Sequence, residues 1–342
     1  MNRRIAVVGT GANGAAIASD LALAGRDVTL IEQWPENVAA IRRRGIVVRL
    51  QNQEFTATAR VLNLSEVATL RETFDVILIV VKTYDTRWAA RLVEPLLAPD
   101  GLMVGVQNGM TMEAIAETVG AHRTMGCVIE NGGAMYDPGV VLRDTPHAKA
   151  WFAVGPYDRQ TEGREAEVVE VLRHSGRVEV YADIRAAKWM KLIVNAAEVA
   201  PSAILDRSLA AAIETPGMRE LMLKVGCEAI EVAKKASIPV VPMFGLPDLD
   251  PENPKAFIET LLDTIIYSYA QPNSKVAALQ DWMKGRRSEI DDMNGAVVRK
   301  GAEVGVETPY NRHVLNIALR IESGALDAGR GNLAPLLAIM DA

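Results

Sequence analysis

The sequence has few cysteines and no excess of positive charge. Cys127 and Cys227 are the only cysteines in 342 residues, and they lie far apart without metal-ligand spacing. This excludes a disulfide framework and favours a reducing compartment. The formal net charge of -6 excludes the overall basic surface that nucleic-acid binding requires. The one compact basic cluster, Arg42–Arg44, stands just before Gly45, where cations favour the end of a helix.

Long apolar runs and clustered metal ligands are also missing. The first apolar run, Ile5–Val8, is too short for the core of a signal peptide or for a membrane span. The histidines show no metal-ligand spacing: His122, His147, His174 and His313. We therefore expect a cytoplasmic protein with no bound metal, and with neither a membrane nor a nucleic acid as its partner.

The length of the chain exceeds what one hydrophobic core usually serves, so we expect two domains. In the first half, strand-like and helix-like segments alternate. This rhythm predicts an α/β fold with a parallel, Rossmann-like doubly wound sheet and helices on both faces. The predicted strands are 5–8, 27–31, 76–81 and 102–106, and the predicted helices are 15–23, 37–44 and 87–97.

Beyond residue 125 the pattern changes twice. Two short β-rich pieces, 140–143 and 150–154, lie beside Pro-Gly and Gly-Pro turns, and we predict them as antiparallel strands added at the edge of the sheet. From residue 184 onward the strand signals nearly vanish. Helices are predicted at 187–200, 217–236, 255–270, 274–304 and 311–322, with an ordered proline-rich loop at 239–254. We therefore divide the chain into a Rossmann-like domain, 1–182, and an all-helical domain, 183–342.

A glycine-rich loop follows the first predicted strand. It is Gly9-Thr10-Gly11-Ala12-Asn13-Gly14, and it stands between a strand and a helix, the context in which a G-x-G-x-x-G pattern binds a dinucleotide. The first glycine allows the tight turn, the second lets the backbone approach a pyrophosphate, and the third lets helix and strand pack closely. We expect the six loop residues to bind a dinucleotide cofactor; a purely structural turn is the alternative.

An acidic residue ends the second predicted strand. Glu32 stands about where a carboxylate accepts hydrogen bonds from the adenosine ribose of a dinucleotide. A carboxylate there repels a 2′-phosphate, and no Lys or Arg occurs in the next few residues. We therefore predict NAD as the preferred cofactor and keep NADP as the alternative. The competing interpretation is that Glu32 merely lies in solvent at the end of its strand.

Several further motifs occur in an order typical of one family. They are Val81-Lys82, Gln107-Asn108-Gly109-Met110, Gly133-Ala134 followed by Pro138-Gly139, the helix Trp189–Asn195, and Ser288-Glu289-Ile290-Asp291 with Asn294-Gly295. With these motifs and the glycine loop, the chain between residues 4 and 320 resembles the ketopantoate reductase family.

This resemblance implies a Rossmann domain, a helical substrate domain and an active site in the cleft between them. It implies that Lys191 is the catalytic lysine, which donates a proton as hydride reaches the keto carbon of the substrate. It assigns cofactor contacts to Lys82, Asn108, Ala134 and Glu289, and it also places Asn108 and Asn195 beside the substrate.

The chemistry of these residues agrees with the roles that the resemblance implies. Lys191 and Asn195 are one helical turn apart and share a face. Because negative charge develops on the oxygen of a ketone during reduction, a nearby cationic proton donor lowers the barrier. By periodicity alone Lys188, one turn earlier, is the competing choice. For Asn108, the alternative to a role in the site is that it is simply a turn residue.

Three positions depart from the polar pattern of the family. Val199 and Leu209 stand where the resemblance implies asparagine, and Ala277 stands where it implies serine. Such a pocket is more apolar and discriminates poorly in favour of a substrate hydroxyl. Ser274, one turn before Ala277, is a compensating candidate for substrate binding. We therefore expect a 2-oxo acid with an apolar side chain rather than ketopantoate.

The expected function is NAD(P)H-dependent reduction of a small 2-oxo acid to a 2-hydroxy acid, or the reverse. Ketopantoate reduction in pantothenate biosynthesis is one alternative. Glu198, on the same helical face as Lys191 and Asn195, favours an imine or opine-type reduction if it meets a substrate amino group. Glu198 in solvent is the competing interpretation. The last alternative is a non-catalytic dinucleotide sensor, which needs only the glycine loop. The sequence also leaves a homodimer as an alternative to a monomer, because 274–304 and Leu333–Met340 offer apolar surface to a second subunit.

Overall fold

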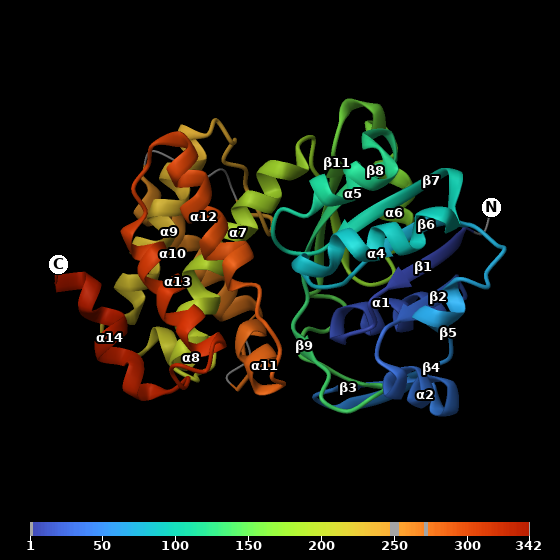
Figure 1. The fold of residues 1–342 in the computed structure, drawn as a ribbon, viewed down its shortest axis with the longest axis horizontal. Coiled ribbons are helices and arrows are strands. Elements are labelled where there is room, and N and C mark those ends of the chain that lie inside the picture. Colours follow the sequence, from blue (N-terminus) through green and yellow to red (C-terminus); the bar gives the residue numbers. More distant parts are fainter. Residues whose placement is uncertain (1–2, 247–252, 270–272, 342) are drawn as a thin grey trace. The chain divides into compact units, whose positions relative to one another are not determined.

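The chain consists of two compact units, Met1–Arg185 and Ala186–Ala342, in a computed structural model that describes residues 3–246, 253–269 and 273–341 (Figure 1). The division falls at Arg185 rather than at residue 182. The first unit contains sheets covered by helices, and the second contains helices. No helix within the described ranges is both long and apolar enough to cross a membrane.

An eight-stranded sheet forms the centre of the first unit. Its strands, in sheet order, are β12 (Arg177–Val180), β11 (Trp151–Pro156), β8 (Thr124–Glu130), β7 (Leu97–Val106), β6 (Phe74–Ile79), β1 (Arg4–Val8), β2 (Asp27–Glu32) and β5 (Arg60–Asn63). Neighbouring strands pair in parallel except β11 and β8. The chain leaves β1 for β2 on one side and returns to β6 on the other, so the predicted doubly wound sheet is confirmed.

Helices cover both faces of this sheet because its central strands are apolar on both sides. In β1, Ile5 and Val7 belong to one buried cluster, whereas Ala6 and Val8 belong to the other. Helices α1 (Ala12–Leu23) and α6 (Glu165–Leu172) pack into the first cluster, as does α2 (Pro35–Arg44). Helices α4 (Thr86–Val93) and α5 (Met112–Val119) pack into the second.

A second, four-stranded sheet corrects one prediction. Its order is β4 (Gln53–Ala57), β3 (Ile46–Leu50), β10 (Val140–Arg143) and β9 (Gly133–Ala134). The segment 140–143 was predicted at the edge of the main sheet, and this is wrong: β10 pairs in parallel with β3, from Val140 opposite Val47 to Leu142 opposite Arg49. The hairpin of β3 and β4, absent from the prediction, supplies that pairing edge. β11 is antiparallel to β8 as predicted, although β12 rather than β11 is the outermost strand.

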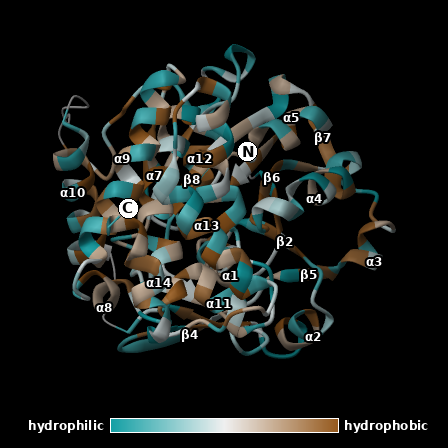
Figure 2. Cartoon of the chain, turned by 60° about the vertical axis from the view of Figure 1, so that its left-hand side comes forward, coloured by the Kyte–Doolittle hydropathy of each residue, from teal (hydrophilic) through white to brown (hydrophobic). Residues whose placement is uncertain are grey.

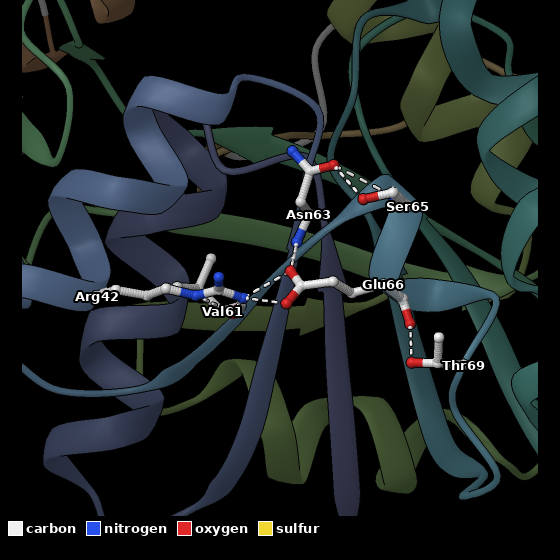
Figure 3. Close-up of polar contacts among 6 residues, drawn as sticks. All are labelled: Arg42, Val61, Asn63, Ser65, Glu66 and Thr69. Carbon is white, nitrogen blue, oxygen red and sulfur yellow. Dashed lines mark hydrogen bonds and ion pairs between the residues drawn. The ribbon is translucent and has the colours of Figure 1, made fainter.

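A short helix, α3 (Leu64–Val67), begins with a capping box (Figure 3). The side chain of Asn63 accepts a hydrogen bond from the helix backbone at 3.2 Å, and Glu66 Oε2 accepts one from the backbone N of Asn63 at 2.8 Å. Arg42 Nη2 donates to Glu66 Oε2 at 2.6 Å and to the carbonyl of Val61 at 2.9 Å. These bonds tie the end of α2 to β5 and α3.

The described part of the second unit is helical. Its elements are α7 (Ile184–Ile204), α8 (Leu209–Ile213), α9 (Met218–Lys235), α10 (Pro254–Thr264) with a π-helical turn (Ile265–Tyr269), α11 (Ala277–Met283), α12 (Ile290–Val304), α13 (Pro309–Glu322) and α14 (Leu333–Leu337). The helices carry both hydrophobic and hydrophilic residues, as Figure 2 shows for α9 and α12. This is the amphipathic pattern of helices that pack around a shared core.

One predicted helix of the second unit is corrected, and two predicted segments fall partly outside the described residues. The predicted helix 274–304 is two helices, because α11 ends at Met283 and Gly285 adopts φ +64°. In the predicted loop 239–254, residues 239–246 form neither helix nor strand and α10 begins at Pro254; residues 247–252 lie outside the described residues, as does residue 270 at the end of the predicted helix 255–270.

Polar side chains that are buried or half-buried join four helices of the second unit. Glu228 of α9 accepts hydrogen bonds from the backbone N of Tyr310 at 2.8 Å and of Asn311 at 2.9 Å, and so satisfies the first turn of α13. Asn294 Nδ2 of α12 donates to Asn311 Oδ1 at 3.1 Å and to the carbonyl of Ala196 in α7 at 3.0 Å. Burial raises the pKa of the Glu228 carboxyl, and the bonds from Asn311 and Tyr310 oppose this.

The capping box predicts how the replacement of Glu66 by Gln depends on pH. The hydrogen bond from the backbone of Asn63, and then Arg42, lower the pKa of Glu66 below 4.5. A depressed carboxyl pKa stabilises the fold above the unfolded-state pKa, and this stabilisation is lost as pH falls through the folded-state pKa. We expect Glu66→Gln to lower the melting temperature at pH 7, and the difference from wild type to shrink at pH 3.

The matched control is Glu54→Gln, which removes the exposed pair of Glu54 with Arg49 on β3 and β4. Exposed pairs of this kind contribute little to stability, so this variant should melt close to wild type at both pH values. A melting difference for Glu66→Gln that stays the same at pH 7 and pH 3 would contradict the assignment.

Candidate active site

Three loops meet at one edge of the main sheet. The strands β1, β6 and β7 are parallel neighbours, so their carboxyl ends lie side by side. The glycine loop follows β1, Lys82 follows β6, and Asn108 follows β7. The order of strands reverses between β1 and β6, and ligands of open α/β sheets bind outside the strand ends at such a point. The sheet therefore brings together the predicted site residues of these three loops.

The glycine loop has the geometry that the pattern predicts. Gly9 adopts φ +89°, and a Cβ at Gly14 would lie 1.9 Å from the carbonyl oxygen of Gly9, so no side chain fits there. Gly11, by contrast, is exposed, and a Cβ on it would meet nothing within 4 Å. Packing within the protein therefore does not require glycine at this position. A pyrophosphate at the start of α1 does require it, because the backbone must come close to the phosphates.

The remaining residues of this edge surround the start of α1. Asn131 Nδ2 donates to Asn13 Oδ1 at 3.1 Å, which fixes the side chain of one loop residue. Ala134 lies in β9, which packs against α1, and is 7% exposed. No side chain caps α1 among the described residues, so no side chain competes with a ligand for the N–H groups of its first turn. This arrangement fits a dinucleotide, which would be held by the six loop residues.

The turns that carry Lys82 and Asn108 are joined by Gln107. Its Nε2 donates to the carbonyl of Val81 at 2.7 Å and to Thr86 Oγ1 at 2.8 Å. The next residue, Asn108, has a buried Oδ1 without a hydrogen-bond partner among the described residues. A buried acceptor of this kind needs a donor, which a ligand can supply. The pair therefore combines a residue that fixes the turn with one that is available to a ligand.

The side chain of Glu32 is buried among hydrogen-bond donors of the protein. It is 5% exposed, and both of its carboxylate oxygens accept hydrogen bonds from the protein. Oε1 accepts from the backbone N of Gln33 and of Trp34, and Oε2 accepts from Thr10 and from Asn37. The burial of Glu32 disagrees with the alternative in which this side chain lies in solvent, and its contact with the ribose of a cofactor stays a prediction.

In the second unit, one helix carries most of the predicted substrate residues. Lys191, Asn195 and Glu198 all lie on α7 and are 3%, 3% and 6% exposed. Asn195 Nδ2 is buried without a hydrogen-bond partner among the described residues. Lys188, the competing lysine, is also buried, at 1% exposed. Burial places the charges of Lys188, Lys191 and Glu198 in a low dielectric, where electrostatic interactions are stronger than in water.

An aromatic residue beside Lys191 was not found from the sequence. Lys191 Nζ lies 6.0 Å from the centroid of the Phe244 ring, within reach of a cation–π contact. Phe244 is 9% exposed and adopts φ +59°, which is rare for a bulky residue and often marks functional positions. The sequence signal at this position is Gly245, which follows Phe244 in the proline-rich stretch. It predicts a turn, but it does not predict that Phe244 contacts Lys191.

Two other predicted residues of this unit lie on different elements. Glu289 is half-buried and directly precedes α12. The preceding residue, Ser288, is held in place because its backbone N donates to Glu322 Oε1 at 2.7 Å. Ser274 is half-buried and precedes the isolated bridge between Lys275 and Ser208. Among the described residues, no group of three or more His, Cys, Asp or Glu side chains could hold a metal ion.

A doubly wound sheet with a glycine loop at its switch point, followed by a helical unit with a buried lysine, defines the class of two-unit dinucleotide-binding oxidoreductases. Sequence models of ketopantoate reductase PanE/ApbA match residues 5–158, and models of its C-terminal part match residues 183–322. The chain therefore belongs to the ketopantoate reductase family, as its motifs predicted.

Individual relatives span almost the whole chain. The 2-dehydropantoate 2-reductase of Archaeoglobus fulgidus is 28% identical over 323 residues, covering 94% of this chain and 99% of that protein. That of Lactococcus lactis is 28% identical over 314 residues, covering 90% and 94%. A PanE/ApbA family ketopantoate reductase from Ralstonia eutropha has a TM-score of 0.78 at 26% identity, covering 94% and 99%. D-mandelate dehydrogenase with NADH and anilino(oxo)acetate has a TM-score of 0.81 at 22% identity, which shows the shared fold.

The position of Lys191 leads to a mutational prediction. The resemblance to the family implies that Lys191 is the general acid, and on that prediction Lys191→Met should lower kcat by about 10²- to 10⁴-fold. The affinity for the dinucleotide, measured by quenching of protein fluorescence, should stay close to that of wild type. Lys188→Met is the matched variant one turn away. Loss of turnover in Lys188→Met together with full turnover in Lys191→Met would contradict the prediction, because it would mean that Lys188 donates the proton.

Proposed function

We propose that this protein reduces a small 2-oxo acid with an apolar side chain to the 2-hydroxy acid, with NADH preferred over NADPH. Membership of the ketopantoate reductase family makes the chain an NAD(P)-dependent oxidoreductase that acts on CH–OH groups and reduces 2-oxo acids. The observation that carries the proposal is the buried Lys191 with Asn195 one turn away on α7.

The dinucleotide supplies the hydride when it is bound, and the residues of the chain supply everything else. The six loop residues hold the pyrophosphate at the start of α1, and Lys82, Ala134 and Glu289 are the further cofactor contacts that we propose. D-mandelate dehydrogenase, which shares the fold, is described with NADH.

Lys191 has the proton that the reaction needs. Addition of hydride to the keto carbon leaves negative charge on the oxygen, and an ammonium group stabilises that charge and then donates its proton to the oxygen. At 3% exposure the ammonium of Lys191 is poorly screened by water. Asn195 and Asn108 each have a buried amide atom without a partner among the described residues, and we propose that both bond to the substrate.

Apolar residues of the second unit favour an apolar substrate side chain. The Phe244 ring lies over the ammonium group, and Val199 and Leu209 are 8% and 5% exposed where the family pattern implies asparagine. Ala277, at the start of α11, is exposed and adds no polar group in place of the serine that the family pattern implies. A pocket that lacks a partner for a substrate hydroxyl gains little by binding one.

Ketopantoate is the second candidate substrate, because the curated relatives in Archaeoglobus fulgidus and Lactococcus lactis are named 2-dehydropantoate 2-reductase. The buried Glu198 keeps an imine substrate as a further alternative. A non-catalytic sensor is disfavoured, since it would have no use for Lys191 and Asn195.

A panel of 2-oxo acids, assayed with NADH and with NADPH, tests the proposal. We expect the highest kcat/KM with NADH and an aliphatic or aromatic 2-oxo acid, and a kcat/KM for ketopantoate at least about tenfold lower, which is the usual effect of a missing polar contact. The comparison is read from the absorbance of the reduced cofactor.

The variant Val199→Asn restores one asparagine that the family pattern implies. It should raise kcat/KM for ketopantoate and so reduce the difference in kcat/KM between ketopantoate and the apolar 2-oxo acids. Val199→Leu is its control, because it changes size without adding a polar group. The highest kcat/KM with NADPH and ketopantoate in wild type would contradict both the substrate and the cofactor assignment.

A further inference from the structure

We propose that Glu32 is a positioning residue that locks the dinucleotide-binding loop, and that it disfavours NADP by occupying the backbone N–H groups that a 2′-phosphate would need. The inference rests on the proposed use of a dinucleotide. It differs from the common role of an acidic residue at this point, which is to bind the ribose hydroxyls directly.

The carboxylate of Glu32 is surrounded by donors from three segments. Oε1 accepts from the backbone N of Gln33 at 2.7 Å and of Trp34 at 2.9 Å. Oε2 accepts from the backbone N of Thr10 at 3.1 Å and from Asn37 Nδ2 at 3.0 Å, and also from the hydroxyl of Thr10. These are charge-assisted bonds, which are stronger than bonds between neutral groups.

The acceptor capacity of Glu32 is therefore used up. An ionised carboxylate has about four lone-pair positions, and five donors point at this one. Glu32 is also 5% exposed. A ribose diol that bonded to it would have to displace donors that belong to the protein. The side chain consequently acts on a dinucleotide through the loop rather than by contact.

The loop is fixed by this side chain through Thr10. Thr10 is fully buried between Gly9 and Gly11, and both its backbone N and its hydroxyl donate to Glu32. Asn37 extends the lock, because its Oδ1 accepts from the backbone N of Gly139 at 2.7 Å, just before β10. A loop held in its binding conformation loses less entropy when a ligand binds, which raises affinity.

The same contacts leave a 2′-phosphate without donors after β2. The N–H groups of Gln33 and Trp34 are bonded to Glu32, and no Lys or Arg occurs before Arg42. Arg42 donates to Val61 and Glu66, as Figure 3 shows. The preference for NAD then follows from missing donors for the phosphate, and not from repulsion by a free carboxylate.

The test compares Glu32→Gln with wild type in the full-length protein. The carboxamide has one oxygen, which can keep the bonds to Gln33 and Trp34, and an amide that faces the donors of Thr10 and Asn37. We expect the dissociation constants of NADH and NADPH, measured by calorimetry without substrate, to rise by about 10- to 100-fold each. Their ratio should change less than threefold. The melting temperature without cofactor should fall, and the loss in turnover should appear in the cofactor KM more than in kcat.

Thr10→Val and Thr10→Ser form a matched pair that keeps the charge of Glu32. The valine removes the hydroxyl that donates to Glu32, whereas the serine retains it, so Thr10→Val should weaken NADH binding and Thr10→Ser should restore most of it. Hydrogen exchange of the amides in residues 9–14 should speed up in Thr10→Val alone. This pair of variants tests whether the bonds between Thr10 and Glu32 fix the loop, even if Glu32→Gln does not fold.

Two results would overturn the proposal. One is a Glu32→Gln protein that melts like wild type and gains affinity for NADPH over NADH, since that is the behaviour of a carboxylate facing the ribose. The other is a Thr10→Val protein with unchanged NADH affinity and unchanged hydrogen exchange. Failure of the proposed function gives a different result, namely a wild-type protein that binds neither NADH nor NADPH.

Discussion

The close approach of α1 to the end of β1 is the constraint on which the first unit depends. The position of a Cβ at Gly14 would be 1.9 Å from the carbonyl oxygen of Gly9, so the start of α1 approaches the residue after β1 too closely for a side chain at Gly14. This contact directs the first turn of α1 over the strand ends, where its N–H groups lack a capping side chain among the described residues. It also buries Thr10, whose two donors then require an acceptor, and Glu32 is that acceptor.

The elements that the sequence predicted well are those specified by neighbouring residues. The apolar runs of β1 and β6 are buried on both faces, and glycines at Gly9 and Gly14 meet steric needs that only glycine satisfies. The pairing of β10 with β3 was missed because it joins residues such as Val140 and Val47, which are distant in sequence and have no periodic relation. Strand pairing of this kind depends on tertiary contacts rather than on local propensity.

The candidate site shows the same limit. The spacing of Lys191 and Asn195 predicted a shared face of a helix, and both residues are buried on α7. The position of Glu32 was predicted, but its orientation depends on Thr10 and Asn37, whose donors no spacing rule includes. Phe244 was missed because its approach to Lys191 requires a left-handed backbone in a loop rather than a periodic element. The family, by contrast, was recognisable because its motifs keep their order along the whole chain.

The central claim is that the chain transfers hydride from a dinucleotide to carbon 2 of a 2-oxo acid while Lys191 protonates the oxygen. The most direct test is to run the reaction with NADH that carries deuterium at the transferable position and to analyse the product by mass spectrometry and NMR. The account predicts a 2-hydroxy acid with deuterium at carbon 2, formed by wild type at a rate that Lys191→Met does not reach. An unlabelled product, or label at any other position, would contradict it.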